Sequence, residues 1–300
     1  MLKIVKNRKW FYLISLAVIF PGLVALVLWK LPLGPDFVGG TLIEVKFSQK
    51  ISGNEITQAA QASKIEIGET GLQPTAENTY LIRTNPLDDN QVNSLTSALK
   101  EKDDKLLILR KETIGPTIGR ELLQRSLLAL GLATLLIVLY IAYAFRTVPK
   151  PASSWRFGVC AILALIHDVL VLFGIFAILG HFFAVEIDAL FVTAVLTVVG
   201  FSVHDTIVVF DRIRENLNRV SYKSFEETVE NSIMQTMARS INTSLTVILV
   251  LLALLLFGGT SVRWFVAALL IGIVSGTYSS IFNAAPLLVT WQNFSTRRKQ

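Results

Sequence analysis

The sequence contains a single cysteine in 300 residues, and this scarcity excludes two kinds of site. Cys160 has no second thiol with which to form an intrachain disulfide, and one cysteine cannot supply the paired ligands of a cysteine metal centre. Neither a His-Glu-x-x-His motif, a Gly-x-Ser-x-Gly motif nor a phosphate-binding glycine loop is present. We therefore expect a protein that is not an enzyme and that binds no metal and no organic cofactor.

Charged residues are also few, at 17% of the chain, whereas hydrophobic residues make up 52%. The apolar residues form long blocks, and a block of about 20 residues matches a hydrocarbon core of roughly 30 Å. The sequence predicts an α-helical polytopic membrane protein with six transmembrane helices. Their ranges are Trp10–Leu31, Leu122–Phe145, Phe157–Gly180, Ala189–Phe210, Ile241–Phe257 and Phe265–Trp291.

The basic residues indicate the orientation of these helices. Lysine and arginine gather in the N-terminal segment, between helices 2 and 3, between helices 4 and 5, and in the tail, which predicts that both termini are cytoplasmic. The first apolar block is too long for a signal peptide and no small-x-small cleavage site follows, so we expect an uncleaved anchor. The net charge of +6 lies where it would meet anionic membrane lipid, which argues against nucleic-acid binding.

Residues 32–121 have the composition of a water-exposed domain, with ten basic and thirteen acidic side chains. Alternating segments and amphipathic helices predict the order β-α-β-β-α-β, typical of a ferredoxin-like fold, on the extracytoplasmic side between helices 1 and 2. The division is thus 1–31, 32–121 and 122–300. The expected elements are Thr41–Ser48, Ser52–Ser63, Lys64–Glu69, Thr79–Thr84, Leu87–Lys102 and Lys105–Lys111.

The cytoplasmic loop 211–238 is the one substantial cytoplasmic segment. Ser224 and Glu227 fit a capping box, and apolar residues recur every four positions from Phe225 to Met237. The pattern is typical of a helix that lies on the membrane surface before the fifth span begins, and a plain connector helix is the favoured alternative.

Ionisable residues inside the spans are the main functional candidates, because burying a charge in hydrocarbon is costly. His167 and Asp168 lie near the middle of the third span, and His204 and Asp205 lie in the inner third of the fourth. Each histidine is interpreted as a packing or hydrogen-bonding neighbour of its aspartate. Either aspartate could also be purely structural.

The start of the fifth span carries a polar stripe, formed by Arg239 with Asn242, Thr243 and Thr246 on one helical face, which we expect to point inward. Asp205 facing Arg239 would form a charge pair that opens when the aspartate takes up a proton. Arg239 could instead be a snorkelling arginine at the membrane edge. In span six, Gly272, Gly276, Ser279 and Asn283 predict a face suited to close helix packing.

Several motifs, in this order along the chain, are similar to those of one family. They are Asp36-Phe37-Val38-Gly39-Gly40-Thr41 after the first span, Ile166-His167-Asp168 in the third, the run Gly200-Phe201-Ser202-Val203-His204-Asp205 through Asn216 in the fourth, and Arg239 to Ser244 in the fifth. Together they resemble the SecF family of protein-export membrane proteins, within the resistance-nodulation-division superfamily. Val38 stands where a threonine is common in that family.

The resemblance implies one half of a SecD–SecF pair in the bacterial plasma membrane. Such a pair works with the SecYEG channel and uses the proton motive force to help move unfolded preproteins across the membrane, with protons as the coupling ion. The essential aspartate and arginine of the family fall on Asp205 and Arg239, and Asp168 is a candidate relay. Gly39 and Gly40 permit positive φ and a tight exit from span one, and we hypothesise that they also form a hinge.

Three other functions fit parts of the sequence. An intramembrane aspartyl protease could use Asp168 and Asp205, but no Gly-x-Gly-Asp motif is present and their depths differ by about 8–10 Å at helical rise. A small-solute transporter of the same superfamily would need a second, similar half. A passive scaffold would need none of the buried charges.

Overall fold

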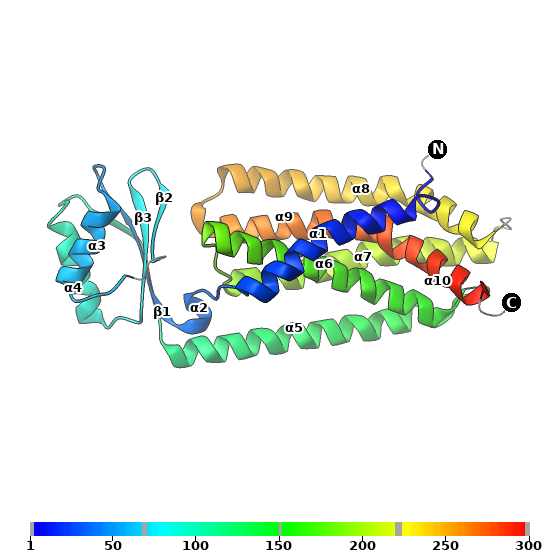
Figure 1. Ribbon diagram of the computed structural model, residues 1–300, viewed down its shortest axis with the longest axis horizontal. Helices are drawn as coiled ribbons and strands as arrows, with labels where there is room; N and C mark the ends of the chain where they lie inside the picture. The colour runs from blue at the N-terminus through cyan, green and yellow to red at the C-terminus, as the bar shows by residue number, and fades with distance from the viewer. Residues whose placement is uncertain (1–2, 68–70, 150–151, 220–223, 298–300) are drawn as a thin grey trace. The chain divides into compact units, whose positions relative to one another are not determined.

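The computed structural model describes residues 3–67, 71–149, 152–219 and 224–297 (Figure 1). The chain forms two compact units. The first comprises Met1–Leu31, Ala129–Val185 and Leu190–Gln300, and the second comprises Pro32–Leu128 with Glu186–Ala189.

Among the described residues, six helical segments are long and apolar enough to cross a membrane, which confirms the predicted multi-pass protein. The sixth span is interrupted by a π-helical turn, η2. The segments are α1 (Arg8–Trp29), α5 (Pro116–Ala144), α6 (Ser154–Phe183), α7 (Ala189–Arg219), α8 (Phe225–Phe257), and α9 (Arg263–Ser279) continued by η2 (Ser280–Ala284) and α10 (Ala285–Arg297). A short 3-10 turn, η1 (Thr260–Val262), precedes α9.

The expected surface helix before the fifth span is not a separate element. Ser224 caps the helix by accepting a hydrogen bond from the backbone N–H of Glu227, but α8 then runs without a break from Phe225 to Phe257. The reason is that this stretch contains neither glycine nor proline, the residues that usually end or kink a helix. Likewise α7 continues to Arg219, so most of the predicted loop is helical; residues 220–223 lie outside the described residues.

Glycines let the membrane helices of the first unit pack closely. A Cβ added to Gly174 on α6 would lie 2.6 Å from the Cα of Gly22 on α1, so the two backbones are in direct contact there. On α9, a Cβ on Gly272 would fall against the side chain of Val198, and one on Gly276 would lie 3.0 Å from the Cβ of Ser202. The predicted packing face of span six is confirmed.

Replacing Gly174 with alanine should therefore destabilise the packing of α1 on α6. The new methyl group can be accommodated only if the backbones separate, and overpacking of this kind costs about 1–3 kcal/mol. Gly158→Ala is a matched control, because it is also on α6 and nothing lies within 4 Å of its added Cβ. The midpoint of thermal unfolding in detergent should fall for Gly174→Ala and not for Gly158→Ala; equal midpoints would contradict the proposed contact.

The second unit contains a four-stranded sheet with two helices on one face (Figure 1). The order along the chain is the predicted β-α-β-β-α-β, the strands are antiparallel, and their order in the sheet is β2-β3-β1-β4. Ser52 and Asp88 begin the two helices with capping boxes. The elements are β1 (Gly40–Lys46), α3 (Gly53–Ala62), β2 (Leu72–Ala76), β3 (Thr79–Thr84), α4 (Asp89–Lys100) and β4 (Leu107–Ile114), preceded by α2 (Pro35–Val38).

The second strand was predicted at the wrong place. Lys64–Glu69 was expected, but residues 64–67 are irregular, residues 68 and 69 lie outside the described residues, and the strand is Leu72–Ala76. Ile65 and Ile67 alternate because both pack into the core, not because their backbone is paired. Pro74 weakened the strand pattern of the true β2, where it is tolerated because β2 is an edge strand.

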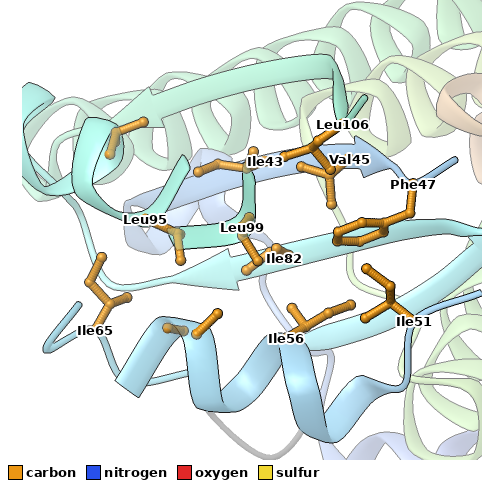
Figure 2. Close-up of a cluster of buried hydrophobic side chains, with 13 residues drawn as sticks. Ile43, Val45, Phe47, Ile51, Ile56, Ile65, Ile82, Leu95, Leu99 and Leu106 are labelled. Carbon is orange, nitrogen blue, oxygen red and sulfur yellow. The ribbon is translucent and has the colours of Figure 1, made fainter. Parts of the chain in front are cut away.

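Apolar side chains from α3, α4 and the facing side of the sheet form one core (Figure 2). It is closed beyond the end of β1 by Phe47, whose ring meets that of Tyr80 edge-on at 5.9 Å. The core residues are Ile43, Val45, Phe47, Ile51, Ile56, Ala59, Ala60, Ile65, Ile82, Val92, Leu95, Leu99 and Leu106.

Asp103 fastens the chain after α4 to the end of β1. Its carboxylate accepts hydrogen bonds from the hydroxyl of Ser48 at 2.7 Å and from the Ser48 backbone N–H at 2.5 Å, and a third from the backbone of Lys105 at 3.0 Å. These bonds, the Ser48 hydroxyl first, hold the pKa of Asp103 below its ordinary value.

Acid should therefore weaken this end of the domain. A carboxyl whose pKa is lowered by folding stabilises the native state above its unfolded pKa, and that stabilisation is lost as the pH falls through the folded pKa. Asp103→Asn should be less stable than the parent at pH 7, and the difference should shrink as the pH falls below 4. Hydrogen exchange of the β1 and β4 amides measures this, with the exposed Asp104→Asn as control; a pH-independent difference would contradict it.

Candidate functional site

The glycine pair after α1 adopts the backbone that the sequence predicts. Gly39 has φ +82° and Gly40 has φ +152°, which residues with a side chain rarely adopt. A Cβ on Gly39 would lie 2.9 Å from the Cα of Pro116, and one on Gly40 would lie 2.9 Å from the carbonyl oxygen of Thr84. Alanine at either position would therefore strain the local fold, so alanine substitution cannot separate a hinge from a structural requirement. The hinge stays a hypothesis.

The other residues of this motif make contacts within the second unit. The Asp36 carboxylate accepts a hydrogen bond at 2.9 Å from the backbone N–H of Ala189, the first residue of α7, and Phe37 is buried. The Thr41 hydroxyl lies 3.0 Å from that of Thr113 and accepts from the backbone N–H of Leu87 at 2.9 Å. The motif thus fixes the start of β1 and reaches the start of α7.

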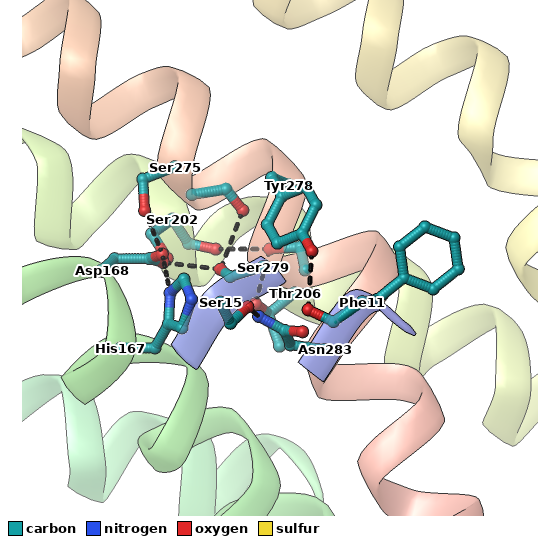
Figure 3. A network of polar contacts seen from close by, with 12 residues as sticks. Phe11, Ser15, His167, Asp168, Ser202, Thr206, Ser275, Tyr278, Ser279 and Asn283 are labelled. Atoms are coloured by element: carbon teal, nitrogen blue, oxygen red, sulfur yellow. Dashed lines mark hydrogen bonds and ion pairs between the residues drawn. The ribbon is translucent and has the colours of Figure 1, made fainter. Parts of the chain in front are cut away.

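Asp168 on α6 is the centre of a compact polar network in the spans (Figure 3). The side chain is fully buried, and its carboxylate accepts hydrogen bonds from three serine hydroxyls, those of Ser202 at 2.5 Å, Ser279 at 2.7 Å and Ser275 at 2.8 Å. His167 Nδ1 lies 3.0 Å from the same carboxylate. His167 is therefore the hydrogen-bonding neighbour that the sequence predicts, and the buried charge is held by donors from α6, α7 and α9.

Asp205 on α7 is also buried, with 2% of its surface exposed, but it is held much more loosely. One carboxylate oxygen lies 3.3 Å from the hydroxyl of Thr277 and 3.5 Å from that of Ser244. These two hydroxyls lie 2.5 Å from each other. The contrast is chemical as well as geometric: Asp205 would lose few hydrogen bonds on taking up a proton, whereas Asp168 would give up part of a tight set.

The two aspartates do not form a dyad. Their carboxylates use different hydroxyls, and they are linked only indirectly, since Ser202 and Asp205 lie one turn apart on α7 and Ser202 bonds Asp168. A pair of carboxylates sharing one proton, as in an aspartyl protease, requires direct contact. The structure brings the candidates into neighbouring networks and not into one catalytic centre.

The predicted ion pair between Asp205 and Arg239 is not present among the residues that the structure describes. Arg239 is exposed and lines a hollow of about 360 Å³ formed by residues of α7 and α8, together with Asp211, Glu215 and Gln235. The reason is rotational: Ser240 and Ser244 occupy the buried face of α8, and a residue one position earlier is turned by about 100°.

The rest of the polar stripe also points away from this bundle. Asn242, Thr243 and Thr246 are exposed, and the inward face of α8 carries Thr236, Ser240 and Ser244 instead. His204 is exposed on α7, although Asp205 beside it is buried. The prediction of an inward stripe is wrong for this chain alone, because Ser240 and Ser244 occupy the buried face of α8, where the Ser244 hydroxyl lies 2.5 Å from that of Thr277 on α9.

Sequence reasoning missed the residues that hold the carboxylates. Ser275 and Thr277 on α9 and Ser244 on α8 were not predicted as site residues, although each bonds one of the two aspartates. The available signal was the spacing of hydroxyl residues four apart within apolar spans, as in Ser240 and Ser244 or Ser275 and Ser279. That pattern marks an inward face when the alternative is hydroxyls in lipid.

Comparison with known proteins identifies the family of this chain. Residues 94–294 match the family described as "Protein export membrane protein SecD/SecF, C-terminal". The chain is 52% identical over 303 residues to the protein translocase subunit SecF of Thermobaculum terrenum, covering 98% of this chain and 95% of that protein. It belongs to the SecF family. A second member, the protein translocase subunit SecF of Anaerolinea thermophila, is 44% identical, with 98% of this chain and 95% of that protein covered.

A solved structure extends the likeness to three dimensions. The crystal structure of SecDF from Thermus thermophilus, described as a translocon-associated membrane protein, matches with a TM-score of 0.85 and 32% identity. The match covers 96% of this chain but only 38% of the SecDF chain. The fold of this SecF-family chain therefore corresponds to one part of a longer polypeptide chain in that relative.

Proposed function

We propose that this chain is a non-enzymatic subunit of the Sec export machinery that works with SecD and SecYEG and uses the proton motive force to promote movement of unfolded preproteins across the bacterial plasma membrane. The observation that carries the proton coupling is the state of Asp205. It is a buried carboxyl in a membrane span, held by only two long hydrogen bonds and by no ion pair within the described chain. A group of this kind can take up and release a proton with little rearrangement of its neighbours.

The exposed polar residues on α7 and α8 support the SecD partnership. Polar side chains in spans face a protein interior or water and avoid lipid, yet His204, Asn242, Thr243 and Thr246 are exposed in this chain. A second membrane subunit covering this surface resolves the conflict. The SecDF relative, in which this fold occupies 38% of the chain, contains the additional polypeptide that such a partner requires.

The proposed proton path runs through the two networks. Asp168 acts as a relay from the extracytoplasmic side, Asp205 is the acceptor, and Arg239 provides positive charge at the inner hollow beside Asp211 and Glu215.

In the proposed orientation both termini are cytoplasmic and the domain of residues 32–121 is extracytoplasmic. The 4-1-3-2 order of the antiparallel strands in this domain supports a ferredoxin-like fold.

Reconstitution tests the proposal. Vesicles containing SecYEG, the translocation ATPase and SecD, with and without this chain, are supplied with a preprotein and an imposed proton gradient. We expect the chain to increase translocation only when the gradient is present and an uncoupler to remove the increase. Stimulation of equal size without a gradient would favour a passive scaffold.

A further inference from the structure

The loop between α6 and α7 is bound to the segment that follows α1. Leu33 and Ile187 form a parallel β-bridge, with hydrogen bonds from the Gly34 backbone N–H to the Ile187 carbonyl at 2.8 Å and from the Ile187 N–H to the Pro32 carbonyl at 2.9 Å. Ile187 is buried, with 7% of its surface exposed. Residues Glu186–Ala189 consequently belong to the same compact unit as the domain, although they lie far away in sequence.

Two side chains fasten the same loop from either end. Glu186 forms an ion pair with Arg83 of β3, with 3.3 Å between Oε2 and Nε, and each side chain is about four-fifths buried. The Asp36 carboxylate binds the backbone N–H of Ala189, where α7 begins. The sheet, the Asp-Phe-Val-Gly-Gly-Thr motif and the first residue of α7 are thereby connected through the segment Glu186–Ala189.

We propose that Glu186–Ala189 is a mechanical link between the proton-binding helix α7 and the domain, and that Arg83, Glu186 and Asp36 are positioning residues for this coupling. The inference rests on the proposed function, because it assigns how a change at Asp205 reaches the domain. Since α7 follows the loop directly, a displacement of its first turn moves residues that are already part of the folded domain unit. The β-bridge, the ion pair and the hydrogen bond to Ala189 together indicate that this loop stays bound to the domain while Asp205 takes up and releases its proton.

The burial of the ion pair explains why it is suited to this role. An exposed pair contributes little, but removing one partner of a buried pair leaves an uncompensated charge and is strongly unfavourable. The pair lines a hollow of about 600 Å³ in the second unit, with Glu66 and Asn85 at the same hollow. Arg83 is thus the cation that balances Glu186 there, and the pair adds a side-chain attachment to the backbone bridge at Ile187.

The first test asks whether the link stays fastened. In a Cys160→Ser background, Leu33→Cys and Ile187→Cys are introduced together; neighbouring strands lie about 4.8 Å apart, within disulfide range. The oxidised protein, reconstituted with SecD and SecYEG, should keep gradient-dependent translocation within about twofold of the reduced protein, as expected when no coupling contact is broken. Loss on oxidation that is reversed by reductant would overturn the proposal, since the loop would then have to detach.

The second test removes the side-chain attachments. Arg83→Gln and Glu186→Gln should each lower gradient-dependent stimulation about fivefold, in the range of coupling energies for contacting pairs, and leave gradient-independent translocation unchanged. The charge-reversed double variant Arg83→Glu/Glu186→Arg should recover most of the loss. Asp36→Ala, which removes the acceptor of the Ala189 backbone N–H, provides a separate variant if the charged-pair variants assemble poorly.

Arg110 and Glu112 provide the matched control, because they form an exposed pair at 2.8 Å on β4 of the same domain. Arg110→Gln should have no effect on stimulation. Normal stimulation in Glu186→Gln, Arg83→Gln and Asp36→Ala at parental membrane levels would overturn the proposed link. Absence of gradient-dependent stimulation in the parent itself would instead count against the proposed function, so the two failures are distinguishable.

Discussion

Replacing Asp205 with asparagine is expected to abolish the part of preprotein export that depends on the proton motive force. Asparagine keeps the size of the side chain and can still accept from the hydroxyls of Ser244 and Thr277, so the packing of α7, α8 and α9 should survive. It cannot take up a proton. Export of a reporter preprotein in cells depleted of the native subunit should therefore fall to the level measured with the gradient collapsed.

Two measurements make this result specific. Membrane levels of the variant should equal those of the parent, because neither oxygen of Asp205 takes part in a tight hydrogen-bond network. Asp211→Asn is the matched control: it lies on the same helix, but its side chain is 55% exposed and paired with Arg214 at 2.6 Å. Normal gradient-dependent export with Asp205→Asn would mean that the buried carboxyl is structural, and the scaffold function would then be preferred.

The spans and the domain could be predicted from sequence because their signals are local. Runs of about 20 apolar residues specify a helix in a membrane, and capping residues such as Ser52 and Asp88 mark where helices of the domain begin. The prediction of β2 failed because Ile65 and Ile67 alternate for reasons of burial, while Pro74 hides the paired strand. Whether a segment forms a strand depends on the strand that pairs with it. Alternation of apolar and polar residues within the segment does not reveal that partner.

The candidate site was predictable as a set of residues but not as an arrangement. The cost of burying charge singled out Asp168 and Asp205, and both are buried. The rotation of α8 was not predictable, because Arg239, Ser240, Asn242 and Ser244 all offer polar groups and only the packing against α9 selects which face turns inward. The sequence pattern also gives no sign that one aspartate has a complete set of donors and the other does not.

Asp168 should respond to substitution differently from Asp205, and the choice of replacement decides what is learned. Alanine leaves the hydroxyls of Ser202, Ser275 and Ser279 without their common acceptor, and each buried group that loses its partner costs about 1–3 kcal/mol. Asp168→Ala should therefore lower the amount of assembled protein in the membrane, as measured by blot and by the thermal midpoint in detergent. Parental levels of Asp168→Ala would contradict the importance of this network for the fold.

Asparagine at position 168 separates the relay from the structural role. Serine hydroxyls can both donate and accept, so they can turn to meet a carboxamide, and the variant should assemble. If Asp168 passes protons toward Asp205, the dependence of export on external pH should change in Asp168→Asn while the assembled amount stays close to that of the parent. An unchanged pH dependence would refute the relay and leave Asp168 as the polar anchor of α6, α7 and α9, with proton uptake at Asp205 following a route that avoids the serine network.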